Sequence, residues 1–149
     1  MMEEAAQLDA AIRALLRALS LDERNAPKLP NGDRLGLLDM ELLTLIAEQP
    51  GIQAKTLIDQ LGVKPTTLQS AIGRLERRKL VSRDTKTLKG RSVALHLTKP
   101  GKSVTDEILS HNLRNCTFLL SALPEKERPL FLSNMAKLAG TVARPTNTE

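Results

Sequence analysis

Side chains that can hydrogen-bond to bases and phosphates gather on one segment of the chain, residues 65–78. Its apolar positions recur with helical spacing and predict a buried stripe formed by Leu68, Ala71, Ile72 and Leu75. At about 100° per residue, the remaining face carries hydroxyls, an amide, a glycine and arginines: Thr66, Thr67, Gln69, Ser70, Gly73, Arg74 and Arg77. Such groups can donate to and accept from base edges and phosphates, and glycine leaves room for close approach. A merely solvated helix would carry Lys and Glu instead, and Glu76 is the one acid on this segment.

The positive charge of the chain is concentrated around this segment. Residues 64–102 hold 11 basic and 2 acidic side chains, a net of +9, whereas residues 1–63 have a net of −4 and residues 103–149 a net of 0. A local excess of this kind is typical of a surface that binds a polyanion, although a solvated lysine-rich surface would look the same. The basic residues beyond the helix fall in a hairpin: Arg83, Lys86, Lys89 and Arg91.

The elements that must position these residues can be predicted from the spacing of apolar residues. A short helix at residues 54–61 ends at Gly62, and Pro65 suits the first position of the next helix. Residues 80–83 and 93–97 then predict two strands joined by a polar, basic tip. Helix, tight turn, helix and two-stranded hairpin together indicate a winged helix-turn-helix lobe over residues 36–99, within an α+β, mainly helical fold.

Helices are also predicted on both sides of this lobe. Residues 3–19, 38–49, 98–123 and 125–139 show helical spacing, whereas residues 21–34 have turn chemistry. Asp39 and Thr98 are candidate N-caps of the helices that follow them, and Pro129 predicts that the last helix starts late or kinks. Apolar residues of the fifth helix step by four, three and four, as in a seam between helices: Leu109, Leu113, Cys116 and Leu120. We therefore expect Cys116 to be a buried, structural cysteine.

Composition excludes several classes of function. The two Phe, with no Tyr or Trp, cannot supply the aromatic platforms that modules for single-stranded nucleic acids need. One cysteine and two distant histidines, His96 and His111, predict neither a metal site nor a disulfide, and no nucleophile–base pattern suggests an enzyme or a cofactor. No apolar run is long enough for a membrane span, and the acidic start is unlike a secretory signal. We expect a soluble, cytoplasmic protein with no membrane partner.

Two stretches of the chain resemble the MarR family of bacterial transcriptional regulators. They are LLTLIAEQPGIQAKTLIDQLGVKPTTLQSAIGRLERRKLVSR (residues 42–83) and GRSVALHLTKPGK (residues 90–102). The resemblance implies a recognition helix at residues 65–78, a wing-tip arginine at Arg91, and a capped helix start at Thr98 and Gly101. The chain departs from the family pattern where Lys64 replaces a capping Ser or Thr, Lys79 replaces a glycine, and Lys89 replaces an acid that would pair with the wing arginine.

The resemblance also implies an assembly and a function. We expect a homodimer, with residues 1–149 forming a single domain and the helices at 1–20 and 100–140 forming the dimerisation region. Its partner would be a palindromic double-stranded operator, and its action that of a repressor, with a small-molecule effector of unknown identity and site. The residues expected to contact DNA are Lys64, Thr66, Thr67, Gln69, Ser70, Arg74, Arg77, Lys86, Lys89 and Arg91. The alternative is a winged-helix architectural or protein-interaction module that reads no DNA sequence.

Overall fold

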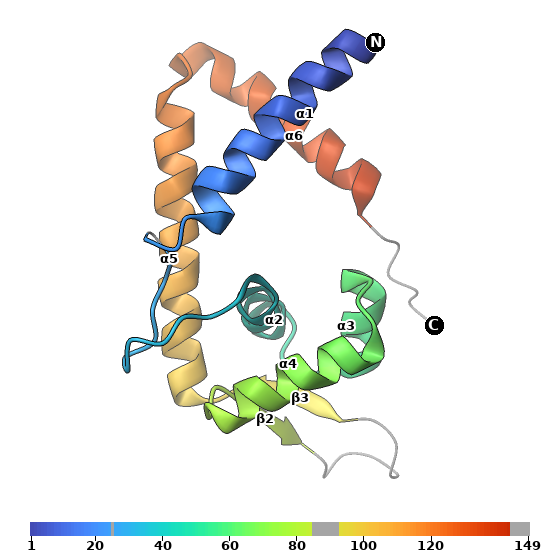
Figure 1. The fold of residues 1–149 in the computed structure, drawn as a ribbon, viewed down its shortest axis with the longest axis vertical. Coiled ribbons are helices and arrows are strands. Elements are labelled where there is room, and N and C mark those ends of the chain that lie inside the picture. The colour runs from blue at the N-terminus through green and yellow to red at the C-terminus, as the bar shows by residue number, and fades with distance from the viewer. Residues whose placement is uncertain (25, 85–92, 144–149) are drawn as a thin grey trace. The chain divides into compact units, whose positions relative to one another are not determined.

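A computed structural model describes residues 1–24, 26–84 and 93–143 (Figure 1). The chain divides into two compact units, Met1–Leu37 and Leu38–Glu149. It is mostly helical and has one small antiparallel sheet, which confirms the predicted fold class. Within the described ranges, no helix is long and apolar enough to cross a membrane.

The first unit consists of a helix and an ordered loop. Helix α1 (Met2–Leu16) continues into a π-helical turn (Arg17–Leu21), and none of its residues is buried. The segment predicted to have turn chemistry then closes on itself through an isolated antiparallel bridge between Lys28 and Arg34. The Asp33 N–H donates to the side chain of Asn31 at 3.0 Å, which is the local turn bond that Asn favours.

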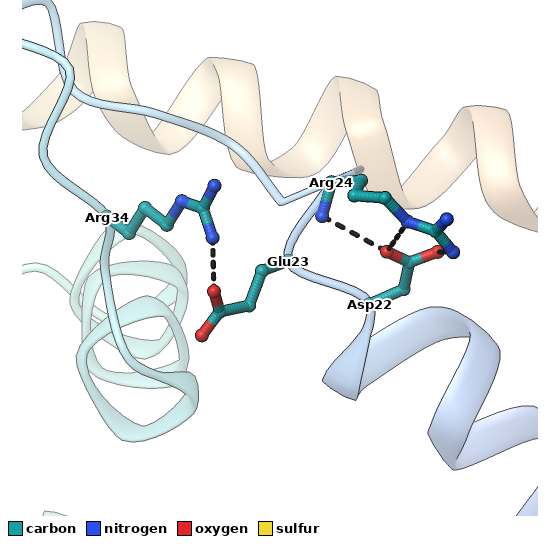
Figure 2. A network of polar contacts seen from close by, with 4 residues as sticks. All are labelled: Asp22, Glu23, Arg24 and Arg34. Carbon is teal, nitrogen blue, oxygen red and sulfur yellow. Dashed lines mark hydrogen bonds and ion pairs between the residues drawn. The ribbon is translucent and has the colours of Figure 1, made fainter.

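Charged pairs hold the entry to this loop, as Figure 2 shows. The Arg24 guanidinium donates to both carboxylate oxygens of Asp22, at 2.8 and 2.9 Å, and Arg34 pairs with Glu23. The hydrogen bonds from Arg24 lower the pKa of Asp22 below its ordinary value, and the same bonds raise the pKa of Arg24. The segment is therefore an organised loop with its own polar contacts.

Three helices of the second unit form the predicted helical part of the lobe. They are α2 (Leu37–Glu48), α3 (Ala54–Leu61) and α4 (Pro65–Arg77). Gly62 ends α3 in the left-handed conformation, at φ 66°, and its N–H donates to the Ile58 carbonyl at 2.8 Å. Pro65 occupies the first turn of α4, as predicted. The prediction that Asp39 caps α2 is wrong, because the helix already begins at Leu37 and the Asp39 side chain bonds elsewhere.

The sheet has three strands in the order β1–β3–β2. Strands β2 (Val81–Asp84) and β3 (Ala94–Leu97) form the predicted hairpin, with Val81 opposite Leu97. Strand β1 (Ile52–Gln53) was not predicted; Ile52 pairs with Leu95 on the other edge of β3. The tip of the hairpin, with the predicted DNA-contacting residues Lys86, Lys89 and Arg91, lies outside the described residues.

The core of the second unit lies under α4 and the sheet. The four residues of the predicted stripe on α4, Leu68, Ala71, Ile72 and Leu75, are all buried. They share the core with Leu42, Leu43, Ile46, Leu57 and Leu95. Helix α3 packs against α4, and α4 against β2, so α4 is fixed on two sides while its polar face stays open.

A long helix follows the sheet. Helix α5 (Lys99–Ser121) starts as predicted, with the Thr98 side chain accepting a hydrogen bond from the Gly101 N–H at 3.0 Å. A 3₁₀ turn (Glu125–Glu127) separates it from α6 (Arg128–Val142), which confirms the late start expected from Pro129. The predicted burial of Cys116 is wrong for the single chain: the thiol is exposed, and the neighbouring seam residue Leu113 is 68% exposed.

Candidate nucleic-acid interface

The face of α4 opposite its buried stripe is open to solvent. Five of the predicted contact residues on the helix are exposed: Thr66, Thr67, Gln69, Ser70 and Arg77. A β-carbon at Gly73 would lie 3.3 Å from Nη1 of Arg77, so the guanidinium of Arg77 lies over the glycine. A patch of hydroxyls, one amide and one guanidinium is thus presented along the helix, with chemistry suited to base edges and phosphates.

The N-terminus of α4 can attract an anion. Lys64 takes the N-cap position in extended conformation, and its side chain makes no capping bond. No acidic residue lies in the first turn, and the partial positive charge at this end of the helix adds to the exposed lysine. Phosphate binding at such an end is favourable. The predicted position of Lys64 at the helix start is confirmed, and its contact with DNA stays a prediction.

Arg74 lies on one side of the open face and is held from below. Its guanidinium donates to Asp39 on α2, with Nη2–Oδ1 at 2.8 Å and Nε–Oδ2 at 3.4 Å. The Asp39 side chain is 5% exposed and that of Arg74 is 43% exposed. These hydrogen bonds, together with the attraction of the carboxylate, raise the pKa of Arg74 above its ordinary value. The pair connects α2 to α4 across the lobe.

A second ion pair fixes the other side of α4. Arg83 on β2 donates from Nε to Glu76 at 2.7 Å and reaches Gln69 from Nη2 at 3.5 Å. The one acid of this helix therefore anchors the wing strand to it. Arg83 was predicted only as part of a basic hairpin, and the structure places it against α4.

The turn after α4 joins the lobe to α5. Lys79 adopts a positive φ of 57°, where the family pattern has glycine, and its carbonyl accepts a hydrogen bond of 2.6 Å from the Thr98 hydroxyl. The Leu80 carbonyl accepts from the Thr98 N–H at 3.0 Å. Gly101 lies so close that a β-carbon there would be 1.9 Å from the same carbonyl. The first turn of α5 is thereby fastened to the end of the candidate recognition helix.

Two hollows lie beside these elements. One, of about 310 Å³, is lined by Ile46, Ala47, Pro50, His96, Leu97, Lys102, Thr105 and Asp106. The other, of about 170 Å³, lies among α3, α4 and the wing strands, and its lining includes Gln53, Lys55, Gln69 and Arg83. Among the described residues, no group of three or more metal-ligating side chains is present.

Solved structures of other proteins have the same arrangement of helices and strands. No family model matches the chain. Over 137 residues it is 25% identical to the uncharacterized HTH-type transcriptional regulator YwhA of Bacillus subtilis, covering 91% of this chain and 95% of the relative. The structure of Streptococcus pneumoniae FabT in complex with DNA superposes with a TM-score of 0.80 at 18% identity, over 93% of this chain and 96% of FabT.

A second DNA complex, of a putative MarR family regulator from Listeria monocytogenes, gives a TM-score of 0.69 at 21% identity over 93% of this chain and 87% of that one. The chain has the MarR fold. The resemblance expected from the sequence is confirmed at the level of the fold, and it extends beyond the lobe to the flanking helices. In the MarR fold of this chain, α4 is the second helix of the helix-turn-helix, and β2 and β3 form the wing.

Proposed function

We propose that this protein is a sequence-specific regulator of transcription that binds double-stranded DNA through α4 and the wing. The observation that carries the proposal is the open face of α4, where hydroxyls, an amide and arginines are presented by a helix whose other side is buried. The MarR fold and the DNA complexes of two structural neighbours support it. A regulator of this kind acts in the cytoplasm, where the DNA lies. We propose that it represses transcription by covering a promoter.

Within this proposal, the described residues divide by chemistry. Thr66, Thr67, Gln69 and Ser70 would read base edges in the major groove, with Arg77 contacting a base or a phosphate. Lys64 would hold a phosphate at the start of the helix. Arg91, Lys86 and Lys89, outside the described residues, would contact the backbone and minor groove, as the resemblance implies.

The main alternative is a basic module that binds any DNA or an acidic protein partner. Backbone binding alone needs cations, whereas the face of α4 also offers Thr66, Gln69 and Ser70, which can discriminate bases. Sequence-specific readout therefore explains more of the side chains on this face.

A selection from a random duplex library at about 150 mM salt tests the proposal, because that salt suppresses non-specific binding. We expect an inverted repeat with half-sites about one helical turn apart. Binding without an enriched sequence would favour the architectural alternative, and no binding at high or low salt would refute both DNA-binding hypotheses.

Single substitutions then separate the two parts of the interface. Arg77→Ala should alter the base preference or lower the affinity for the selected site, whereas Arg114→Ala on the exposed surface of α5 should do neither. Arg91→Ala should weaken binding to all sequences and reduce the salt dependence by about one phosphate contact. An Arg91 variant with unchanged affinity and salt dependence would contradict the wing assignment.

We further propose that the protein acts as a homodimer through its terminal helices. On α5 and α6, large apolar side chains are open to solvent in the single chain; they include Leu113 (68% exposed), Phe118 (74%), Leu130 (67%) and Leu132 (51%). Apolar patches on this scale are typical of surfaces that a second chain covers. The inverted repeat expected above requires the same twofold symmetry.

Leu113→Glu tests the dimer. Because the Leu113 side chain is mostly exposed in the single chain, the substitution should leave the fold of one chain intact and disrupt only contacts with a second chain. Sedimentation should show the wild type as a dimer and the variant as a folded monomer. The neighbouring Asn112→Glu adds the same charge at another exposed position of α5 and should leave the dimer intact. Equal association of all three proteins would refute the role of this face.

We also propose that a small-molecule effector binds this protein. The 310 Å³ hollow between the end of α2, β3 and the first turns of α5 is mainly apolar, with Lys102 and Asp106 among its polar lining residues. A ligand seated there would touch both the lobe and α5. A thermal-shift screen of small organic acids and amines, followed by Lys102→Ala for any compound that raises Tm, would identify or exclude binding at this hollow.

A further inference from the structure

We propose that Asp39 is a positioning residue that fixes the guanidinium of Arg74 so that its outer edge reads a guanine. The inference rests on the proposed function, since it assigns a specificity-determining contact to the same interface. Asp39 itself touches no DNA in this scheme and acts through Arg74 alone.

The hydrogen bonds to Asp39 leave the end edge of the Arg74 guanidinium, formed by Nη1 and Nη2, available to a base. Asp39 engages Nε and Nη2, the side edge of the group, at 3.4 and 2.8 Å. Of the five N–H donors of an arginine, the two on Nη1 and the outer one on Nη2 remain. This end edge carries two parallel N–H groups, the arrangement that pairs with O6 and N7 of guanine in the major groove.

Burial shows that the pose is imposed by the protein. The Asp39 carboxylate is 5% exposed, whereas 43% of the Arg74 side chain remains open to solvent. Helix α2 thus supplies a fixed, buried acceptor, and the guanidinium of Arg74 on α4 is held against it while part of the side chain stays in solvent. A long side chain loses much rotamer freedom when it binds, so a side chain already held in place binds more tightly and more selectively.

The helix that carries Arg74 is itself fixed. On its other side, Glu76 and Gln69 contact Arg83 of the wing strand at 2.7 and 3.5 Å. Restraints on both sides prevent α4 from rolling, so the direction of the Arg74 end edge is set relative to Ser70 and Arg77 on the open face.

The sign of the electrostatic effect makes the inference testable. A carboxylate near a DNA-binding face repels phosphates, so its neutralisation should by itself strengthen binding to every duplex. If Asp39 positions Arg74, its neutralisation instead weakens binding to the operator while leaving binding to other sequences equal or tighter. A purely structural role would change both affinities together.

The experiment compares Asp39→Asn with Glu48→Gln, an equal change of charge at the exposed end of the same helix. Each protein is tested against the selected operator and a scrambled duplex by fluorescence anisotropy at about 150 mM salt. For Asp39→Asn we expect about a tenfold loss on the operator and none on the scrambled duplex; Glu48→Gln should treat both duplexes alike. Equal behaviour of the two variants would overturn the inference.

A second variant keeps the test decisive if Asp39→Asn folds poorly. Arg74→Lys retains a cation beside the buried carboxylate but lacks the two-pronged edge. In a repeated library selection, it should lose the enrichment of one guanine position in each half-site and keep the other positions. Retention of every enriched guanine would overturn the inference, whereas failure of the wild type to enrich any sequence would refute the proposed function and this inference with it.

Discussion

Gly101→Ala should strongly destabilise the second unit, because the new β-carbon would lie 1.9 Å from the Leu80 carbonyl oxygen and 2.9 Å from its carbon. Relief requires a shift of more than 1 Å, since contacts below 3.0 Å are essentially never observed. Leu80 is buried and its carbonyl also accepts the Thr98 N–H, so the shift strains the core and weakens a hydrogen bond. Overpacking of this severity costs about 3 kcal/mol, and the better helix propensity of alanine returns about 1 kcal/mol. We expect a net loss of about 2 kcal/mol.

Urea denaturation followed by circular dichroism measures this loss, at one fixed protein concentration because dimerisation would add to stability. Gly36→Ala is the control: Gly36 is exposed, lies outside the proposed dimer helices, and a β-carbon there meets no atom within 4 Å. The control should be neutral or stabilised by up to about 1 kcal/mol. If both variants unfold at the same urea concentration, the close packing of α5 on Leu80 is not as described.

Three further measurements test other features. Lys79→Gly should stabilise the protein by about 0.5–1 kcal/mol, since glycine adopts the φ of 57° without strain, and a lower Tm would contradict this. Cys116 is exposed in the single chain, so its labelling by a maleimide should be rapid in the monomeric Leu113→Glu variant and slower in wild type at high concentration; equal rates would show that the dimer leaves the thiol open. Asp22, whose pKa is lowered by its hydrogen bonds to Arg24, should titrate below a reference aspartate in NMR. Its contribution to stability is then complete above the unfolded-state pKa and is lost as pH falls through the folded-state pKa.

Local patterns in the sequence were sufficient to predict most helices and strands of the winged helix-turn-helix lobe. The burial of Leu68 and Leu75 follows from the helical period of apolar residues. Gly62 ends α3 and Thr98 starts α5 through hydrogen bonds to residues three or four positions away. Such signals depend on neighbours in the chain, so they can be recognised without knowledge of the fold. The same period identified the open face of α4 correctly.

Contacts between distant residues were not predictable in this way. Asp39 has the residue type of an N-cap, but its partner Arg74 is 35 positions away, and no local pattern connects them. Strand β1 has two residues, which is too short for an alternation to be detected, and it exists because β3 offers a free edge to Ile52 and Gln53.

Cys116 shows a different limit of sequence reasoning. Spacing indicates which residues share a face of a helix, and it placed Cys116 correctly in line with Leu113. It does not indicate whether the same chain covers that face. In the single chain the face is open, so its apolar character points to a second molecule and not to the interior of the first.

The two ion pairs beside α4 have a consequence for how this protein could acquire new target sites. Two residues hold the helix: Glu76 pairs with Arg83 of the wing strand, and Arg74 pairs with Asp39 of α2. Thr66 and Ser70 are exposed. Under the proposed function, substitutions at Thr66 and Ser70 would therefore change base preference at little cost in folding stability. Variants selected at these positions would differ in the DNA sequence that they bind, provided that Asp39 and Arg83 stay unchanged and continue to hold α4 in place.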